Sequence, residues 1–180
     1  MSHYVVIINI IGFQVGWFAC VISAANNQPE TGIIIALIVI ALHIYISKNK
    51  TTTLLLLLIV TLFGGTWDSI LTFQNILQFN SGIFSPFLAP SWIFIMWTLF
   101  ATTLNVSLGW LYGHYFYAMI IGAICGPLVY QGGAALGAVV IPQTYATNIL
   151  LAIAWSLILP LMILLSEIIE KYSLVEATKK

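Results

Sequence analysis

The residue best placed to do chemistry is Asp68, the only aspartate in a chain of 180 residues. It lies inside the apolar stretch 52–78, in the local sequence Gly-Gly-Thr-Trp-Asp-Ser. An ionisable group in a membrane-spanning segment costs about 3 kcal/mol on insertion scales, so such groups face the protein interior and pair with a partner. Asp68 is therefore the candidate catalytic residue, although its surroundings in the sequence do not name a reaction.

Polar residues in other apolar stretches fall at a depth similar to that of Asp68. At a helical rise of about 1.5 Å per residue, Gln14, Asn105 and Tyr130 lie near the middle of the bilayer. Their amide and hydroxyl groups can donate the hydrogen bonds that a buried carboxylate requires. Asn75 follows Asp68 by seven residues, which predicts that both share one helical face and that polarity continues toward the outer end.

Three indole rings extend this predicted site near the midplane. Trp17, Trp67 and Trp97 lie at or near membrane depth, where an indole can stack on a flat group or donate one hydrogen bond. The predicted ligand-binding residues are Gln14, Trp17, Trp67, Asp68, Asn75, Trp97, Asn105 and Tyr130. The alternative is that these groups only hold helices together, which polar side chains commonly do in membrane bundles.

Other kinds of chemistry find little support in the residue pattern. His43 and His114 are too isolated to form a metal-binding motif, and no nucleophile elbow or phosphate-binding loop occurs. Cys20 and Cys125 lie in apolar stretches, where free cysteine behaves as a small buried hydrophobe. We therefore expect no metal site, and the sequence does not indicate which cofactor, if any, the protein binds. The formal net charge of zero gives no basic footprint for a nucleic acid.

Composition places these residues in a lipid bilayer. The chain is 61% hydrophobic and 6% charged, with a mean hydropathy of +1.07, whereas soluble domains carry about 25% charged residues. About six stretches reach the length of roughly 20 apolar residues that a spanning helix needs: 4–25, 31–47, 52–78, 91–112, 115–140 and 147–169. We predict an all-α polytopic membrane helical bundle, with one transmembrane domain over residues 1–170 and a cytoplasmic tail over 171–180.

The positions of the lysines orient the predicted bundle. All five follow the second or the sixth apolar stretch: Lys48, Lys50, Lys171, Lys179 and Lys180. An even number of crossings separates these two places, so every lysine falls on the same side of the membrane. The positive-inside rule makes that side cytoplasmic. Both termini are then cytoplasmic as well, and Glu30 lies on the opposite side.

Two further features concern loops and helix contacts. The uncharged segment 79–92 contains Pro86 and Pro90, which prevent a regular helix. We interpret it as a loop in the outer membrane interface with Trp92 as an aromatic anchor, and the alternative is a lid over an outward-opening cavity. Glycines four residues apart offer close helix contacts and would also allow an oligomer to form: Gly12 and Gly16, Gly122 and Gly126, and Gly133 and Gly137.

Several of these stretches together resemble a known family. They are GFQVGWFAC at 12–20, GGTWDS at 64–69, residues 90–97 and 100–108, and GAICGPLVY at 122–130. Their combination is similar to a family of small multi-pass proteins of the bacterial inner membrane, known only as a domain of unknown function. The resemblance covers nearly the whole chain and implies no settled activity. Family members tend to occur beside genes for lipid modification and photo-oxidative stress, which implies lipid chemistry by analogy.

Three functions stay open at this point. We expect a membrane protein that binds a small amphipathic or lipid-like ligand within the bundle. The alternatives are an intramembrane enzyme acting on a lipid or isoprenoid, with Asp68 as acid or base, and a small proton- or cation-coupled transporter. A cavity open sideways to lipid would favour lipid binding or lipid chemistry, an inverted repeat would favour transport, and a fully packed core would favour a structural role.

Overall fold

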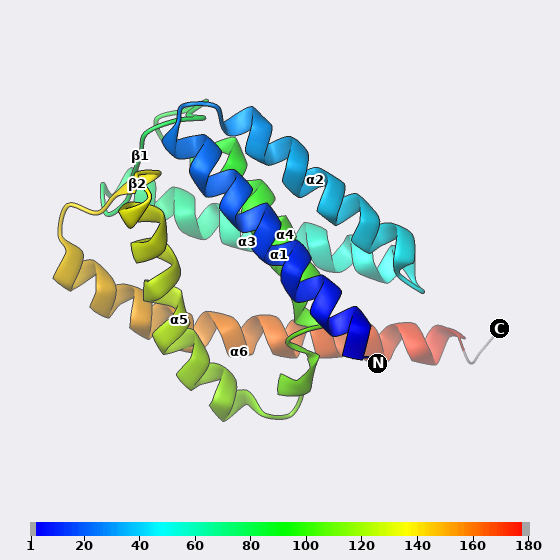
Figure 1. The fold of residues 1–180 in the computed structure, drawn as a ribbon. Helices are drawn as coiled ribbons and strands as arrows, with labels where there is room; N and C mark the ends of the chain where they lie inside the picture. Colours follow the sequence, from blue (N-terminus) through cyan, green and yellow to red (C-terminus); the bar gives the residue numbers. More distant parts are fainter. Residues whose placement is uncertain (1–2, 178–180) are drawn as a thin grey trace.

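The computed structural model describes residues 3–177, and helices make up most of this part of the chain (Figure 1). The elements are α1 (His3–Ala25), α2 (Pro29–Ile46), α3 (Lys50–Phe73), β1 (Gln78–Phe79), α4 (Ser91–Leu104), the 3-10 helix η1 (Gly109–Leu111), α5 (Tyr115–Ala135), β2 (Val139–Val140) and α6 (Thr144–Ala177). The predicted all-α polytopic bundle is confirmed.

Five of the described helices are long and apolar enough to cross a membrane: α1, α2, α3, α5 and α6. The fourth predicted stretch forms a shorter helix, because α4 has only 14 residues and extends about 21 Å. A hydrocarbon core is about 30 Å thick, and the chain continues beyond α4 through a turn and η1. The five long apolar helices make this a multi-pass membrane protein.

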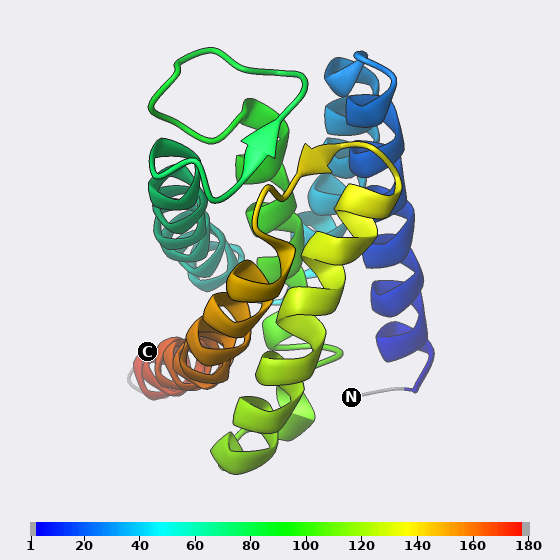
Figure 2. The ribbon, with the colours of Figure 1, turned by 90° about the vertical axis from the view of Figure 1, so that its left-hand side faces the viewer.

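Helix α4 lies at the centre of the packing. It contacts α1, α2, α3 and α6, whereas α5 packs mainly against α6. Figure 2 shows α4 between the α1–α2 pair and α3. Two glycines bring backbones together, since a Cβ at Gly32 would meet the backbone of Cys20 in α1, and a Cβ at Gly122 would meet the Trp155 carbonyl in α6. Small residues allow this close approach in membrane helices.

The end of the bundle opposite the lysines is closed by loops. β1 and β2 pair antiparallel, with Phe79 opposite Val139. Each strand has two residues, which is too short for an alternating pattern in the sequence to predict it. Trp92 is 2% exposed and its ring lies 5.5 Å from that of Phe79. Its indole donates a hydrogen bond to the Ser81 carbonyl. Trp92 is therefore a core residue, and its interpretation as an interfacial anchor was wrong.

The third helix ends earlier than the stretch 52–78 predicted. α3 stops at Phe73, and Asn75 adopts a left-handed backbone with φ of 56°. Asparagine tolerates this conformation better than most residues and commonly follows a helix C-terminus. Hydropathy alone missed this end because Ile76 and Leu77 keep the stretch apolar. The spacing had predicted that Asn75 shares a helical face with Asp68. This prediction was wrong, because the helix ends before Asn75.

The two described lysine-bearing segments lie at one end of the molecule. The α2–α3 turn, the start of α1 and the far part of α6 come together in Figure 1, and the Asn49 amide donates a hydrogen bond to the Ser173 hydroxyl. The turn before α2, which carries Glu30, lies at the opposite end. Lys179 and Lys180 fall outside the described residues. This arrangement agrees with the even number of crossings between the lysine clusters.

The domain division at residue 170 does not coincide with a helix end. α6 continues from Thr144 through Lys171 to Ala177, so the residues predicted as a tail begin within a helix. The bounds of the transmembrane domain and of the tail stay a prediction, as does the cytoplasmic location of both termini.

We expect positions 30 and 49 to lie on opposite sides of the membrane, because the lysines of the α2–α3 turn stay on the cytoplasmic face. Single cysteines would replace Glu30 or Asn49 in a chain whose own Cys20 and Cys125 are changed to alanine. In sealed vesicles of uniform orientation, an impermeant maleimide should label only one of the two before permeabilisation. Labelling of both positions from the same side would contradict the topology.

Candidate functional site

The carboxylate of Asp68 is buried among aromatic donors from two other helices. Asp68 is 2% exposed. The indole Nε1 of Trp97 in α4 donates to Asp68 Oδ2 at 2.6 Å, and the Tyr130 hydroxyl in α5 donates to Asp68 Oδ1 at 2.7 Å. The expected contact between Asp68 and Tyr130 is thus present. Charge-assisted hydrogen bonds of this kind are about twice as strong as neutral ones, so α3, α4 and α5 meet at one carboxylate.

These three residues lie at the same level, nearer to the end of the bundle opposite the lysines than to its middle. Asp68 and Tyr130 each precede the ends of their helices by five residues, and Trp97 follows the start of α4 by six. At 1.5 Å per residue, the cluster lies about 8 to 9 Å from that end of the bundle. Asp68 therefore lies closer to the end of its helix than the stretch 52–78 predicted, because α3 ends at Phe73, and its depth in the membrane stays a prediction.

Stacked rings support the Asp68 cluster. Trp97 stacks on Trp155 of α6, with ring centroids 5.3 Å apart and planes 10° apart, and Phe100 meets both indoles edge-on. A Cβ at Gly64 would collide with the Trp97 ring, and a Cβ at Gly126 would collide with Trp155. The two glycines therefore provide the space in which the paired indoles fit.

Two further indoles belong to the same aromatic region. Trp67 precedes Asp68 on α3, and Trp155 stacks on Trp97. The buried indole N–H groups of Trp67 and Trp155 have no hydrogen-bond partner among the described residues. Asp68 itself accepts one hydrogen bond on each of its carboxyl oxygens.

Beside this cluster lies a cavity of about 590 Å³. Its walls come mainly from α1, α4 and α5, with one residue each from α3, β1 and β2 and two each from α6 and the turn after α4. The lining residues are Ile10, Phe13, Gln14, Trp17, Val21, Asp68, Phe79, Trp92, Ile93, Met96, Trp97, Phe100, Thr103, Ser107, Leu108, Ile121, Gly122, Cys125, Gly126, Val129, Tyr130, Gly133, Val139, Trp155 and Leu159. Asp68 is the only charged residue among them, so the cavity is a mostly apolar chamber with a polar group at one wall.

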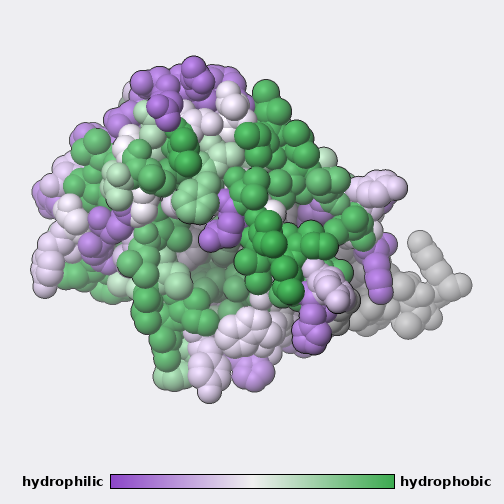
Figure 3. Space-filling model, in the orientation of Figure 1, coloured by the Kyte–Doolittle hydropathy of each residue, from purple (hydrophilic) through white to green (hydrophobic). Residues whose placement is uncertain are grey.

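The cavity opens between α1 and α5. Ile10 on α1 and Val129 on α5 both line it, and they are 47% and 41% exposed. Gln14 and Cys125, which also line it, are exposed as well. Figure 3 shows a largely hydrophobic face that is hollowed between these two helices. Because α1 and α5 are both long and apolar enough to cross a membrane, this opening lies on the side of the bundle and not at either of its ends.

Five of the eight predicted site residues line this cavity: Gln14, Trp17, Asp68, Trp97 and Tyr130. Trp67, which precedes Asp68 on α3, does not line it. Asn105 is the residue that follows α4. It lies about 12 Å from Trp97 along the helix axis, because Trp97 is the α4 residue at the level of Asp68. The roles of these residues in binding stay a prediction.

Asn75 belongs to a different and more polar cavity. This second cavity, of about 420 Å³, lies between the turn after α3 and the start of α6, where it is lined by Gln74, Asn75, Gln143 and Thr147 among others. Asn75 is exposed there. The expectation that it would join the site of Asp68 was wrong, because the helix ends before Asn75.

Trp155 is the site residue that sequence reasoning missed. It lies far from both ends of α6, whereas a tryptophan that anchors a helix in the membrane interface lies near a helix end. The signal that could have revealed it is the pair Gly122 and Gly126, which was interpreted only as a helix contact face. Gly122 lets the Trp155 backbone approach closely, and the Trp155 side chain occupies the space that a Cβ at Gly126 would fill.

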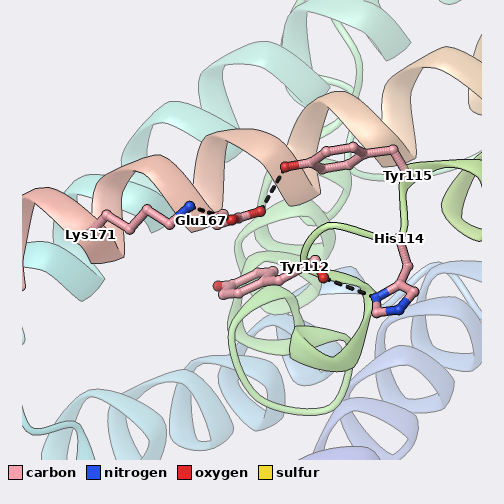
Figure 4. Close-up of polar contacts among 5 residues, drawn as sticks. All are labelled: Tyr112, His114, Tyr115, Glu167 and Lys171. Atoms are coloured by element: carbon pink, nitrogen blue, oxygen red, sulfur yellow. Dashed lines mark hydrogen bonds and ion pairs between the residues drawn. The ribbon is translucent and has the colours of Figure 1, made fainter.

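A second polar cluster holds α5 to α6 at the lysine end (Figure 4). The Tyr115 hydroxyl donates to Glu167 Oε2 at 2.7 Å, and Lys171 donates to Glu167 Oε1 at 2.6 Å. His114 Nδ1 lies 3.0 Å from the Tyr112 carbonyl. Exposed ion pairs of this type contribute little to stability, so we assign the cluster to anchoring the helix ends. Within residues 3–177, no cluster of potential ligands could hold a metal ion.

Replacing Gly64 by alanine should destabilise the fold, because the added Cβ would collide with the Trp97 ring that donates to Asp68. Overpacking of this kind costs about 1 to 3 kcal/mol. Gly109→Ala is the matched control, since the nearest atom to its added Cβ would lie at 4.0 Å. Melting temperatures in a mild detergent should fall for Gly64→Ala alone, and equal melting temperatures of the two variants would refute the packing argument.

Comparison with known proteins gives one family. No curated protein and no solved structure matches the chain significantly. A family described as "Protein of unknown function (DUF2878)" matches residues 6–161. That match spans α1 to α5 and more than half of α6, including every element that contributes to the cavity. The chain therefore belongs to the DUF2878 family of proteins of unknown function.

Proposed function

We propose that this membrane protein binds a lipid-like amphipathic ligand in the cavity between α1 and α5. The observation that carries the proposal is the sideways opening, where exposed Ile10 and Val129 flank a cavity that reaches Asp68. A ligand entering by this route must come from the bilayer. The volume of about 590 Å³ lies within the range of roughly 300 to 1,000 Å³ that is usual for small-molecule sites.

The chemistry of the walls supports the same ligand class. Most lining residues are aliphatic or aromatic, and the polar ones are few and separated: Gln14, Asp68, Thr103, Ser107 and Tyr130. Apolar walls suit a hydrocarbon chain, while separate polar groups fix the orientation of a head group. An amphipathic molecule satisfies both requirements.

Binding accounts for the site better than catalysis with paired acids. Asp68 is the only carboxylate among the residues that line the cavity, and both of its oxygens already accept hydrogen bonds from the protein. Two-carboxylate chemistry would need a second acid at the same depth. The carboxylate therefore acts first as an anchor of the cavity wall, and its negative charge selects among head groups.

The test uses bilayer lipids whose acyl chains carry bromine, which quenches tryptophan on contact. The protein would be placed in nanodiscs of phosphatidylcholine with either 9,10-dibromostearoyl or oleoyl chains. Trp110 is 58% exposed, so it is first changed to phenylalanine to remove a background signal. Chains that enter the cavity should quench the emission of its indoles, which include Trp17 and Trp155.

A comparison of Gly133→Leu with Ala135→Leu tests whether the quenching comes from lipid chains inside the cavity. Gly133 lines the cavity, and an added Cβ would meet Val139 at 3.4 Å, an ordinary contact, so the rest of a leucine side chain would occupy the cavity. Ala135→Leu adds comparable volume at an exposed position of α5 that is not part of the lining. Quenching should fall in Gly133→Leu only. Equal quenching of both variants would refute entry of lipid chains.

A further inference from the structure

Gln14 is a polar residue in an unusual place. It is the middle residue of α1 (His3–Ala25), about 16 Å from each helix end at 1.5 Å per residue. Its side chain is exposed and lines the cavity at the opening toward α5. The amide therefore lies near the bilayer midplane, where neither water nor lipid tails offer hydrogen-bond partners.

The protein itself does not satisfy this amide. Within residues 3–177, no hydrogen bond joins the Gln14 side chain to another side chain or to the backbone. By contrast, Asn9, which precedes it on the same helix, donates to the Thr102 carbonyl of α4 at 3.0 Å. An amide in an apolar medium without a partner costs several kcal/mol. A ligand group that pairs with Gln14 would remove this cost.

We propose that the Gln14 amide is a second hydrogen-bonding contact of the bound ligand, and that the ligand is an uncharged polar lipid whose head carries hydroxyl or ester groups. This inference rests on the proposed lipid-binding function. A hydroxyl or ester can accept from the amide N–H, and a hydroxyl can donate to its carbonyl. The head then lies deep in the bundle, between Gln14 and the Asp68–Tyr130 pair, both of which line the same cavity.

Charge excludes the common anionic head groups. The chain contains no arginine, and none of the residues that line the cavity is a lysine. The described lysines lie at one end of the bundle, next to the α2–α3 turn and in the last part of α6. A phosphate group brought into the cavity would meet the Asp68 carboxylate without a counter-ion, and burying an unpaired charge is strongly unfavourable.

The test compares two lipids that differ only in the phosphate. The probes are 1-(9,10-dibromostearoyl)-glycerol and its 3-phosphate, titrated into the Trp110→Phe protein in oleoyl phosphatidylcholine nanodiscs while tryptophan emission is recorded. The neutral probe should quench to saturation, and the phosphate should not. Gln14→Leu should raise the half-saturation concentration of the neutral probe about three- to tenfold, as expected for one lost hydrogen bond.

Ile11→Leu is the matched control. Ile11 lies three residues before Gln14, is 57% exposed and does not line the cavity. Ile11→Leu should therefore leave the half-saturation concentration of the neutral probe unchanged. Saturable quenching that is equal in Gln14→Leu and Ile11→Leu would overturn the role of Gln14 while leaving lipid binding intact. Saturable quenching by the phosphate with the same affinity would overturn the uncharged head group.

Two other outcomes separate the remaining explanations. If neither probe saturates and the cavity-filling Gly133→Leu variant also behaves like its control, the proposed function fails together with this inference. If Gln14→Leu changes the mass of the protein measured in nanodiscs, the amide pairs with a second copy of the chain, and the ligand contact is rejected. Unchanged mass together with the three- to tenfold shift supports it.

Discussion

The Asp68 carboxylate must find hydrogen-bond donors within the protein, because the surrounding hydrocarbon supplies none. Trp97 and Tyr130 supply them from α4 and α5. This single requirement brings three helices together at one point. It matters most for α5, which otherwise packs mainly against α6. The rest of the aromatic cluster follows, since Trp97 stacks on Trp155 and both rings occupy the space left by glycines.

The cavity follows from the same arrangement. The Asp68 cluster holds α5 near α3 and α4 at one level, and β1–β2 pairing closes the bundle at the nearby end. α1 is held on the other side by α2 and α4. The space between α1 and α5 is then filled neither by a helix nor by large side chains, and it opens on the side of the bundle. A buried carboxyl group and a cavity with a side opening are thus consequences of one set of contacts, which links the stability of the fold to its proposed function.

Sequence reasoning predicted the parts of this account that depend on composition and on the cost of charge. Hydropathy located the helices, and the cost of an unpaired acid in hydrocarbon predicted that Asp68 would be buried and would reach at least one of Gln14, Asn105 and Tyr130. Tyr130 is the one that donates to it. Sequence reasoning failed where local backbone geometry decides. A left-handed Asn75 ends α3 early, and Asn105 is far from the site because α4 meets Asp68 at Trp97, near the other end of that helix. Trp92 was misplaced because its packing on Phe79 depends on strands of two residues, and Trp155 was missed because its position follows from glycines on another helix.

The most direct test of the central claim is a double-mutant cycle between Asp68 and Tyr130. The free energy of unfolding would be measured in mixed micelles for the parent chain, Asp68→Asn, Tyr130→Phe and the double variant. Removing the Tyr130 hydroxyl should cost about 1.5 to 3 kcal/mol beside the carboxylate, and at least about 1 kcal/mol less beside asparagine, because the charge-assisted hydrogen bond is then absent. If Tyr130→Phe costs the same in both backgrounds, within the roughly 0.3 kcal/mol expected of independent sites, then the Asp68–Tyr130 interaction does not hold α5 to the bundle and the account is contradicted.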